Sequence, residues 1–334
     1  MIKNKHILAL CTTAFFNDRG CHTRILKILK FMEKEGNTVD ILTYSCGRDL
    51  NGFKIFRISR LFRQFDPVGF HPLKILFDIQ IFFKALKMLQ NKRYDYILSF
   101  THEAGMVSLM IKLLYGKEYI LDYQGSLYSE MTTSNPVFRF PPFSFIIISL
   151  EKIVEKKSYG IIYNTNFNFK RSKKKNKLYV NDDIFEEDKK IMQDVNKNKI
   201  FKIVWLGVNT KVQNLKSFLE IAENILKKKK NVVFYIISFP ISKNMKNKYN
   251  EYEDRIIFLE KIPFESLPEY LKDADMCIST KLDSTEGSGK LHLYKRFCKN
   301  ILSLDSKISR EVLSESDIVK SVEEMEEKIL ERIR

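Results

Sequence analysis

Several features that would assign a chain of 334 residues to a function class are missing from this sequence. The five cysteines are scattered and form no CxxC pair, which argues against a zinc cage or a disulfide framework. The longest apolar stretch, Phe140–Leu150, is too short to span a bilayer and contains two prolines. The opening MIKNKHILALC lacks the long apolar core and the cleavage site of a signal peptide, so a buried strand is expected there. These absences favour the cytoplasm.

A phosphate-binding P-loop is also missing. The stretch DSTEGSGKLHLYK (residues 283–295) contains GSGK, which resembles the end of such a loop. A P-loop needs a glycine five positions before the second glycine, and a Ser or Thr after the lysine to bind magnesium. Here Ser284 holds the glycine position and Leu291 follows Lys290. The pattern therefore argues against a P-loop ATPase, and this loop needs another explanation.

Positive charge is abundant and uneven. The net charge is 57 − 41 = +16, of which residues 1–180 carry +15 and residues 181–334 carry +1. The densest basic run is Lys170–Lys177, and a second stretch, residues 53–65, mixes arginine with phenylalanine. Basic and aromatic residues together suit an anionic lipid surface. Nucleic acid and an ordinary solvated surface remain alternatives at this point.

Apolar segments of strand length alternate with segments of helical periodicity along the whole chain, as in TVDILTY followed by KILFDIQIFFKALKMLQ. This alternation predicts βαβ units on parallel sheets. The charged, apolar-poor stretch 181–199 is expected to be a linker between a first domain (1–180) and a second domain (200–334). Two open α/β halves predict a cleft between them, with ligands at the carboxyl ends of the strands.

Taken together, the segments that follow the expected strands resemble the family 4 glycosyltransferases. The resemblance lies in DRGCHTRILKILKFMEKEGNTVDILTY, YDYILSFTHEAG, ILDYQGSLYSEM, IVWLGVNTKVQNLKSFLEIA and STKLDSTEGSGKLHLY, and it spans nearly the whole chain. It implies the α/β GT-B fold, in which two Rossmann-like domains face a central cleft. It also implies a retaining glycosyltransferase that moves a sugar from a nucleotide diphosphate-sugar to a hydroxyl acceptor.

Donor-side residues are expected mainly in the second domain. A glycine-flanked turn that opens a helix presents free backbone N–H groups to phosphates, and a lysine there balances a leaving diphosphate. The resemblance assigns Lys290 to the donor phosphates and Glu286 to the donor sugar, with catalytic roles for both. The further donor-binding candidates are Gly20, Gly207, Lys211, Gln213, Lys281, Gly287, Ser288 and Gly289.

Acceptor-side residues are expected in the first domain. His102 follows a strand, where a histidine can donate to a sugar hydroxyl or move a proton, and the resemblance places it near the donor sugar as a third catalytic candidate. A histidine that caps the next helix is the alternative. The other acceptor-side candidates are Arg24, Glu103, Asp122, Gln124 and Gly125. Arg24 is expected either at the cleft or on the helix surface.

Three departures from the family pattern favour a competing hypothesis. Val208 replaces an arginine, Leu293 replaces a ribose-holding glutamate, and the small-residue turn before the next strand reads KRFCKN. A degenerate, non-catalytic protein that binds or stabilises a partner enzyme therefore stays open. Another GT-B activity, such as sugar-nucleotide epimerisation, is a further alternative.

The partners expected from sequence are a nucleotide-sugar donor and a glycan or lipid-linked acceptor. We expect no cofactor and no metal site, because His6, His71 and His292 show no metal-ligand spacing with carboxylates and the resemblance implies an enzyme that needs no bound metal. RNA-stacking motifs are absent, so no nucleic acid is expected. The basic first half predicts peripheral contact with an anionic membrane, which would place the chain in the cytoplasm at the inner membrane face.

Overall fold

A computed structural model describes residues 2–59, 71–185, 200–260 and 262–333. The arginine and phenylalanine positions 60–65 and most of the expected linker, residues 186–199, lie outside these ranges. The described chain divides into two compact units. Of the described residues, the first contains 2–17, 21–59, 71–182 and 285–287, and the second contains 18–20, 183–185, 200–260, 262–284 and 288–333.

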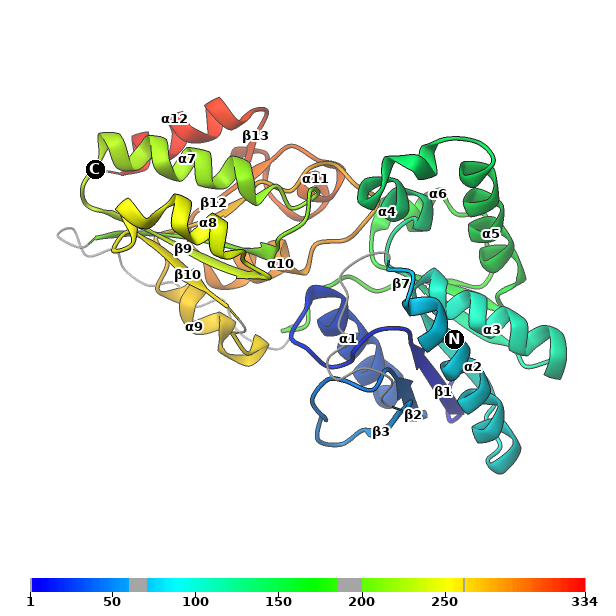
Figure 1. Ribbon diagram of the computed structural model, residues 1–334. Coiled ribbons are helices and arrows are strands. Elements are labelled where there is room, and N and C mark those ends of the chain that lie inside the picture. The colour runs from blue at the N-terminus through cyan, green and yellow to red at the C-terminus, as the bar shows by residue number, and fades with distance from the viewer. Residues whose placement is uncertain (1, 60–70, 186–199, 261, 334) are drawn as a thin grey trace. The chain divides into compact units, whose positions relative to one another are not determined.

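The first unit is built on a sheet with strand order β3-β2-β1-β4-β5-β6-β7, and every strand pairing in it is parallel (Figure 1). The strands are β1 His6–Cys11, β2 Thr38–Thr43, β3 Lys54–Arg57, β4 Tyr96–Phe100, β5 Tyr119–Tyr123, β6 Gly160–Tyr163 and β7 Lys177–Tyr179. The helices are α1 Gly20–Lys34, α2 Lys74–Asn91, α3 Thr101–Tyr115, α4 Leu127–Ser134, η1 Pro136–Arg139, α5 Phe143–Lys157 and α6 Asn166–Arg171.

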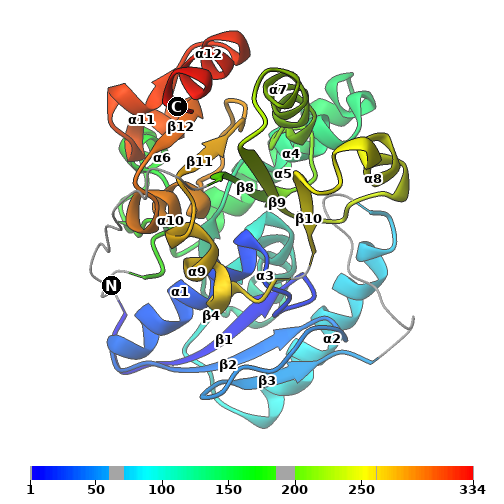
Figure 2. The ribbon, with the colours of Figure 1, turned by 90° about the vertical axis from the view of Figure 1, so that its left-hand side faces the viewer.

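Helices cover both faces of this sheet. Figures 1 and 2 show α1 on one face, whereas α2, α3 and α5 lie side by side on the other. The central strands are short apolar runs that are buried on both sides, as parallel strands require; five of the six residues of β1 are buried. Gly105 lets α3 approach α5 closely, because a Cβ there would lie 2.6 Å from Val154 Cγ1.

The second unit has a smaller parallel sheet with strand order β10-β9-β8-β11-β12-β13. The strands are β8 Phe201–Val208, β9 Val232–Phe239, β10 Ile256–Leu259, β11 Met276–Ser279, β12 Ile301–Leu304 and β13 Ile318–Val319. The helices are α7 Leu215–Lys228, α8 Lys243–Lys248, η2 Asn250–Tyr252, η3 Phe264–Ser266, α9 Leu267–Lys272, α10 Gly289–Phe297, α11 Lys307–Val312, η4 Glu315–Asp317 and α12 Val322–Arg332.

In this unit α7 and α12 lie on one face of the sheet, and α9 and α10 lie on the other (Figures 1 and 2). The amphipathic α7 buries one stripe against β8 and β9, where Phe218 stacks on Trp205 at 6.1 Å between ring centroids. The two units therefore each have a hydrophobic core of their own.

Candidate functional site

In the second unit, β8 and β11 form a topological switch point. They are neighbours in the sheet, but the chain leaves β8 through α7 toward β9 and leaves β11 through α10 toward β12. In open parallel sheets, ligands bind at the carboxyl ends of such a strand pair. The loops that follow these two strands carry most of the expected donor residues, among them Lys211, Gln213, Lys281 and Ser288.

Lys290, in the first turn of α10, is the most unusual residue at this point. Its side chain is buried, and its Nζ has no hydrogen-bond partner. The Nζ lies 5.0 Å from the centroid of the Trp205 ring. Burial and the nearby charge of Lys281, itself 1% exposed, hold the pKa of Lys290 well below its ordinary value. Two buried lysines in one place favour the binding of an anion that would relieve their repulsion.

Hydrogen bonds fix the two loops that surround these lysines. Trp205 Nε1–H donates to Thr280 Oγ1 at 3.0 Å, and Thr280 donates in turn to the Asn214 carbonyl at 2.9 Å. The Leu282 N–H donates to the Val212 carbonyl at 2.8 Å. The loop after β11 is therefore tied to the loop after β8 by hydrogen bonds.

Tyr294 anchors α10 to the same strand pair. Its hydroxyl accepts from the Leu206 N–H at 2.7 Å and donates to the Ile278 carbonyl at 3.2 Å. These two hydrogen bonds hold α10, and with it Gly289 and Lys290 in its first turn, against the ends of β8 and β11. The positive end of the helix dipole adds to the charge of the lysines.

Further polar atoms at this point lack partners. Gln213 Oε1, Ser279 Oγ and Ser288 Oγ are buried and accept or donate no hydrogen bond. Gly207 leaves the space that this arrangement needs, since a Cβ there would lie 3.0 Å from the Trp205 ring and 3.3 Å from Gln213 Oε1. Unsatisfied buried polar groups are costly and are retained where a ligand completes them. Lys211 is exposed on the same loop.

The departures from the family pattern lie in the same unit. Leu293 is 8% exposed and packs into the interior from α10, so no polar group is offered at its position. Val208 ends β8. Neither residue supplies the charge or carboxylate found in the family pattern.

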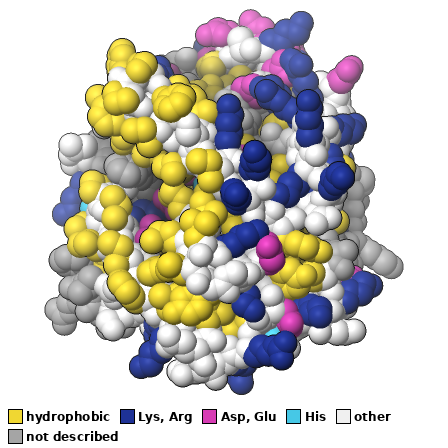
Figure 3. Space-filling model, turned by 90° about the vertical axis from the view of Figure 1, so that its right-hand side faces the viewer, with side chains coloured by type: hydrophobic (Ala, Val, Ile, Leu, Met, Phe, Trp, Pro, Cys, Tyr) yellow, Lys and Arg dark blue, Asp and Glu magenta, His cyan; other side chains and the backbone are white. Residues whose placement is uncertain are grey.

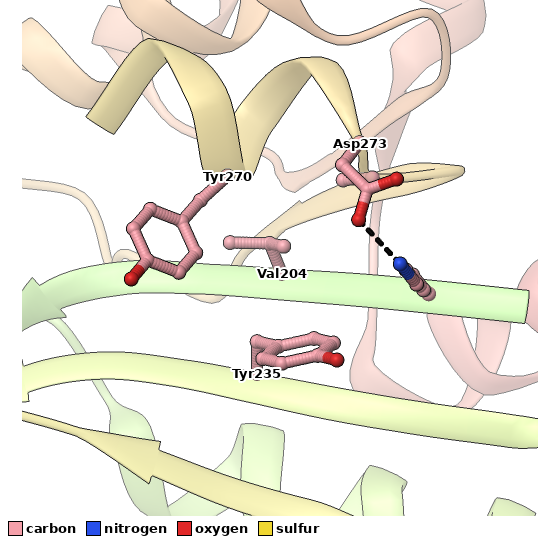
Figure 4. A pocket seen from close by; sticks show the side chains of 6 residues that line it. Val204, Tyr235, Tyr270 and Asp273 are labelled. Atoms are coloured by element: carbon pink, nitrogen blue, oxygen red, sulfur yellow. Dashed lines mark hydrogen bonds and ion pairs between the residues drawn. The ribbon is translucent and has the colours of Figure 1, made fainter. Parts of the chain in front are cut away.

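A separate hollow lies away from these strand ends, under α9. Figure 4 shows Tyr270 of α9, Val204 of β8 and Tyr235 of β9 around it, with Asp273 paired to a lysine at the start of β8. That lysine is Lys202. We assign this hollow no function.

In the first unit, Arg24 lies neither at the surface of α1 nor free for a ligand. Its guanidinium donates to Asp122 Oδ1 at 2.7 and 3.2 Å, pairs with Asp182 at 3.3 Å, and also donates to the Val180 and Asn181 carbonyls. The Asp122 carboxylate is fully buried and accepts from Gln124 Nε2 at 2.9 Å. The structure thus joins three acceptor-side candidates into one buried network.

The candidates after β4 lie in the first turn of α3, not in a loop. Glu103 pairs with Lys74 of α2 at 2.5 Å. His102 is 3% exposed, and its Nε2 lies 3.3 Å from Glu155 of α5. Its imidazole also packs edge-on against Tyr123. The N-cap of α3 is Phe100 and no side chain caps it, so the capping alternative for His102 is not what the structure shows. The catalytic role stays a prediction.

One group of metal-ligand type occurs within the described ranges. Atoms of His102, Glu151 and Glu155 lie within 4.8 Å of one another. Glu151 already accepts from Ser126 Oγ at 3.0 Å and from the Tyr128 N–H at 2.9 Å. These two hydrogen bonds stabilise the N-terminus of α4 and give Glu151 a structural role. The expectation of no metal remains a prediction.

Residues 285–287 belong to the first unit. The Ser126 N–H donates to Thr285 Oγ1 at 2.9 Å, and Asn168 Nδ2 donates to the Thr285 carbonyl at 3.0 Å. Glu286 lies against Gly125, where a Cβ would come within 2.8 Å of the Glu286 Cγ. The structure therefore groups Glu286 with the acceptor-side candidate Gly125, while Lys290 belongs to the second unit.

Sequence patterns did not reveal Trp205, Thr280, Tyr294 or Asp182 as parts of these sites. Each acts through a contact with a residue at least 16 positions away along the chain.

Gly20 begins α1, and a Cβ there would meet nothing within 4 Å.

Neither a protein-family model nor a curated protein matches this sequence. Solved structures do match in fold. Sucrose-phosphate synthase from Thermosynechococcus elongatus has a TM-score of 0.73 at 13% identity over 98% of this chain and 89% of that one. WaaG, a glycosyltransferase involved in lipopolysaccharide biosynthesis, has a TM-score of 0.71 at 12% identity over 97% and 90%. Anabaena HepE in complex with UDP-glucose has a TM-score of 0.67 at 12% identity over 99% and 90%.

The chain has the GT-B fold. Its two parallel α/β sheets match those of GT-B glycosyltransferases over nearly its whole length, which confirms the fold class expected from sequence. Identities of 12–13% establish the fold alone. The sites of these proteins are therefore not carried over to this chain.

Proposed function

We propose that this protein is a retaining glycosyltransferase of family 4 that moves a sugar from a nucleotide diphosphate-sugar to a hydroxyl acceptor. The observation that carries the proposal is the buried, unpaired Lys290 beside Lys281 at the switch point of the second sheet. Such a site suits a diphosphate, whose charge the two lysines and the N-terminus of α10 would balance. HepE, of the same fold, is recorded in complex with UDP-glucose, which supports this class of donor.

In this reaction the acceptor oxygen bonds to the anomeric carbon of the sugar, and the bond from that carbon to the diphosphate oxygen breaks. The acceptor proton passes to the departing diphosphate or to solvent. Lys290 would stabilise the charge that develops on the leaving diphosphate. Glu286 would hold sugar hydroxyls and stabilise positive charge at the anomeric carbon. Among the described residues, these roles need no metal or cofactor.

We propose a glycan or a lipid-linked glycan as acceptor, at the inner membrane face. The support is the excess of positive charge in residues 1–180, which would attract the chain to anionic lipid. The buried network of Arg24, Asp122 and Gln124 would shape the acceptor side by holding the strand ends rather than by direct contact.

A panel of UDP-, GDP-, ADP- and dTDP-sugars with mass-spectrometric detection of the released nucleotide tests this function. We expect turnover of at least one donor, and a decrease in kcat/KM of about 100-fold or more for Lys290→Met and for Glu286→Gln. Lys216→Met is the matched control, because its side chain is 84% exposed on α7. Unchanged turnover in the Lys290 and Glu286 variants would refute the site assignment.

The alternative is a non-catalytic GT-B protein that stabilises a partner enzyme. Leu293, buried where the family pattern has a ribose-holding acid, and Val208 favour it. A ligand that binds only the native state raises its thermal stability. If no nucleotide-sugar is consumed and no nucleoside diphosphate raises the unfolding temperature, the alternative holds.

A further inference from the structure

The outer surfaces of α2, α3 and α5 are apolar where the surface helices of a soluble protein are normally polar. In the described chain, 15 of the 19 exposed large hydrophobic side chains lie in α2, α3 and the segment from η1 through α5. We call these 15 side chains the apolar face. Its most exposed members include Phe83 on α2, Leu113 on α3 and Phe145 on α5, at 63%, 73% and 73% exposure.

The exposed apolar residues recur at helical spacing. On α2, Ile75, Ile79 and Phe83 form a stripe that ends in the exposed Lys87, while Phe77 and Ile81 on the opposite side enter the core. Both sides of the helix are therefore apolar, so that one side packs on the sheet and the other is left uncovered.

On α5 the same pattern is repeated. Phe143, Ile146, Leu150 and Ile153 form an exposed stripe that ends in Lys157. The apolar stripe of each helix thus ends in a lysine. This arrangement suits a bilayer surface, where apolar side chains enter the acyl region and lysine ammonium groups stay at headgroup level.

The stripes lie on one surface because α2 packs against α3 and α3 packs against α5. Figure 3 shows this side, on which hydrophobic side chains gather into a broad patch and Lys and Arg side chains border it. Contiguous exposed patches of this kind mark interaction sites. Within the described ranges, no helix is long and apolar enough to cross a membrane.

The exposed charge around the apolar face is mostly positive. From residue 71 to residue 180, eleven Lys and Arg residues are exposed, against two acidic residues, Asp95 and Glu130. Lys152, Lys156 and Lys157 lie on α5 itself. A second copy of this chain on the same surface would bring like charges together. Anionic lipid headgroups would instead neutralise them.

We propose that the apolar face inserts into the headgroup and acyl-chain boundary of an anionic bilayer, with the lysines of α2, α5 and α6 at headgroup level. This inference deepens the membrane location proposed above and is independent of the transfer reaction. It adds the apolar face to the basic contact expected from sequence, and within the stretch 53–65 it leaves out Arg57, which is held by backbone carbonyls. Its guanidinium donates to the Phe15 and Cys46 carbonyls at 2.8 and 2.6 Å.

Flotation of the purified full chain with vesicles tests the proposal. We expect binding to vesicles of phosphatidylcholine with about one third phosphatidylglycerol, weaker binding to phosphatidylcholine alone, and a partial loss at high salt. The triple variant Phe83→Ser/Leu113→Ser/Phe145→Ser should lower the affinity for anionic vesicles on the order of 100-fold. Lys152→Glu/Lys156→Glu should lower it about 10-fold or more.

Two controls match these variants. Ile200→Ser removes an apolar side chain that is 52% exposed in the second unit, and Lys243→Glu reverses an exposed charge there. Neither should change binding. Vesicle binding that survives the triple variant would overturn the proposal. So would a stable dimer, measured by light scattering, that the triple variant converts to a monomer. Donor turnover by detergent-free enzyme is measured in parallel, so that failure of membrane binding and failure of the transferase function remain distinct.

Discussion

Lys290 has a positive charge that its surroundings oppose, and this makes it a residue whose removal should stabilise the unliganded protein. Its pKa is lowered, so the unfolded chain binds the proton more tightly than the folded chain does. Folding stability therefore rises as pH climbs through the folded pKa toward the ordinary value. The unfolding free energy of Lys290→Met at pH 7 should exceed that of the wild type by about 1 kcal/mol or more, so the variant should unfold at a higher urea concentration. The variant should also lose the rise in stability with pH.

Urea unfolding at pH 7 and pH 9 measures this effect, with Lys216→Met as the exposed control. A wild-type protein that is more stable than Lys290→Met at pH 7 would show that the lysine has a structural partner. Higher stability combined with lost donor turnover would show a residue kept for binding at a cost in stability.

The carboxyl of Asp78, on α2, should make the stability of the fold depend on pH. Its Oδ1 accepts from the Tyr44 hydroxyl at 2.6 Å, and burial together with the Glu103 charge raises its pKa to about 7. The folded state binds the proton more tightly than the unfolded chain, whose Asp pKa is about 4. The contribution to stability is therefore present below pH 4 and lost as pH rises to 7.

Asp78→Asn cannot titrate, so its stability relative to wild type should improve by about 2 kcal/mol between pH 5 and pH 8. Urea unfolding at one-unit intervals of pH measures the difference. Asp254→Asn, at an exposed position in the second unit, is the control. A difference that stays constant with pH would mean that Asp78 is ionised throughout this range.

At the scale of elements, Arg24 ties α1 to the strand end of β5 and to the segment after β7. Arg24→Met would leave Asp122 and Asp182 buried without their cation, at a cost of about 3–5 kcal/mol in unfolding free energy. Lys30→Met, at an exposed position of the same helix, should cost little. If Arg24→Met loses transfer activity but less than about 1 kcal/mol of stability, the arginine acts on the acceptor as first expected.

Continuous apolar runs made many elements predictable from sequence. HILALC coincides with β1 and GKLHLYKRF with α10, because buried parallel strands and amphipathic helices have distinct periods. Other elements were missed for physical reasons. β3 is a four-residue edge strand with alternating exposure. The polar start of α3, Thr101–Glu103, resembles a loop, although an acidic residue in the first turn favours a helix.

The candidate site was predictable only in part. The glycine-flanked lysine of residues 287–290 is a local pattern, and the structure shows that this lysine is buried and unpaired. The contact between Trp205 and Thr280 and the pairing of Arg24 with Asp182 link positions 75 and 158 residues apart. Such contacts depend on strand order, and nothing in the local sequence specifies them.

At the scale of the whole molecule, the single tryptophan reports on one unit only. Trp205 is fully buried in the core of the second unit, and its ring lies 5.0 Å from Lys290 Nζ. Since each unit has its own core, thermal unfolding followed by tryptophan fluorescence reports the second unit, whereas far-UV circular dichroism reports both.

Uridine diphosphate should therefore raise the fluorescence-detected transition and change the emission of Trp205 in the folded state. At about 100 times the dissociation constant, the expected stabilisation is about 2.7 kcal/mol. Lys290→Met should abolish both effects, and Lys216→Met should preserve them. A nucleotide-induced shift that persists in Lys290→Met would place the diphosphate elsewhere. If the shift instead follows the guanosine or adenosine nucleotide, the same lysines bind the diphosphate, and the base is selected by the remaining groups at the ends of β8 and β11.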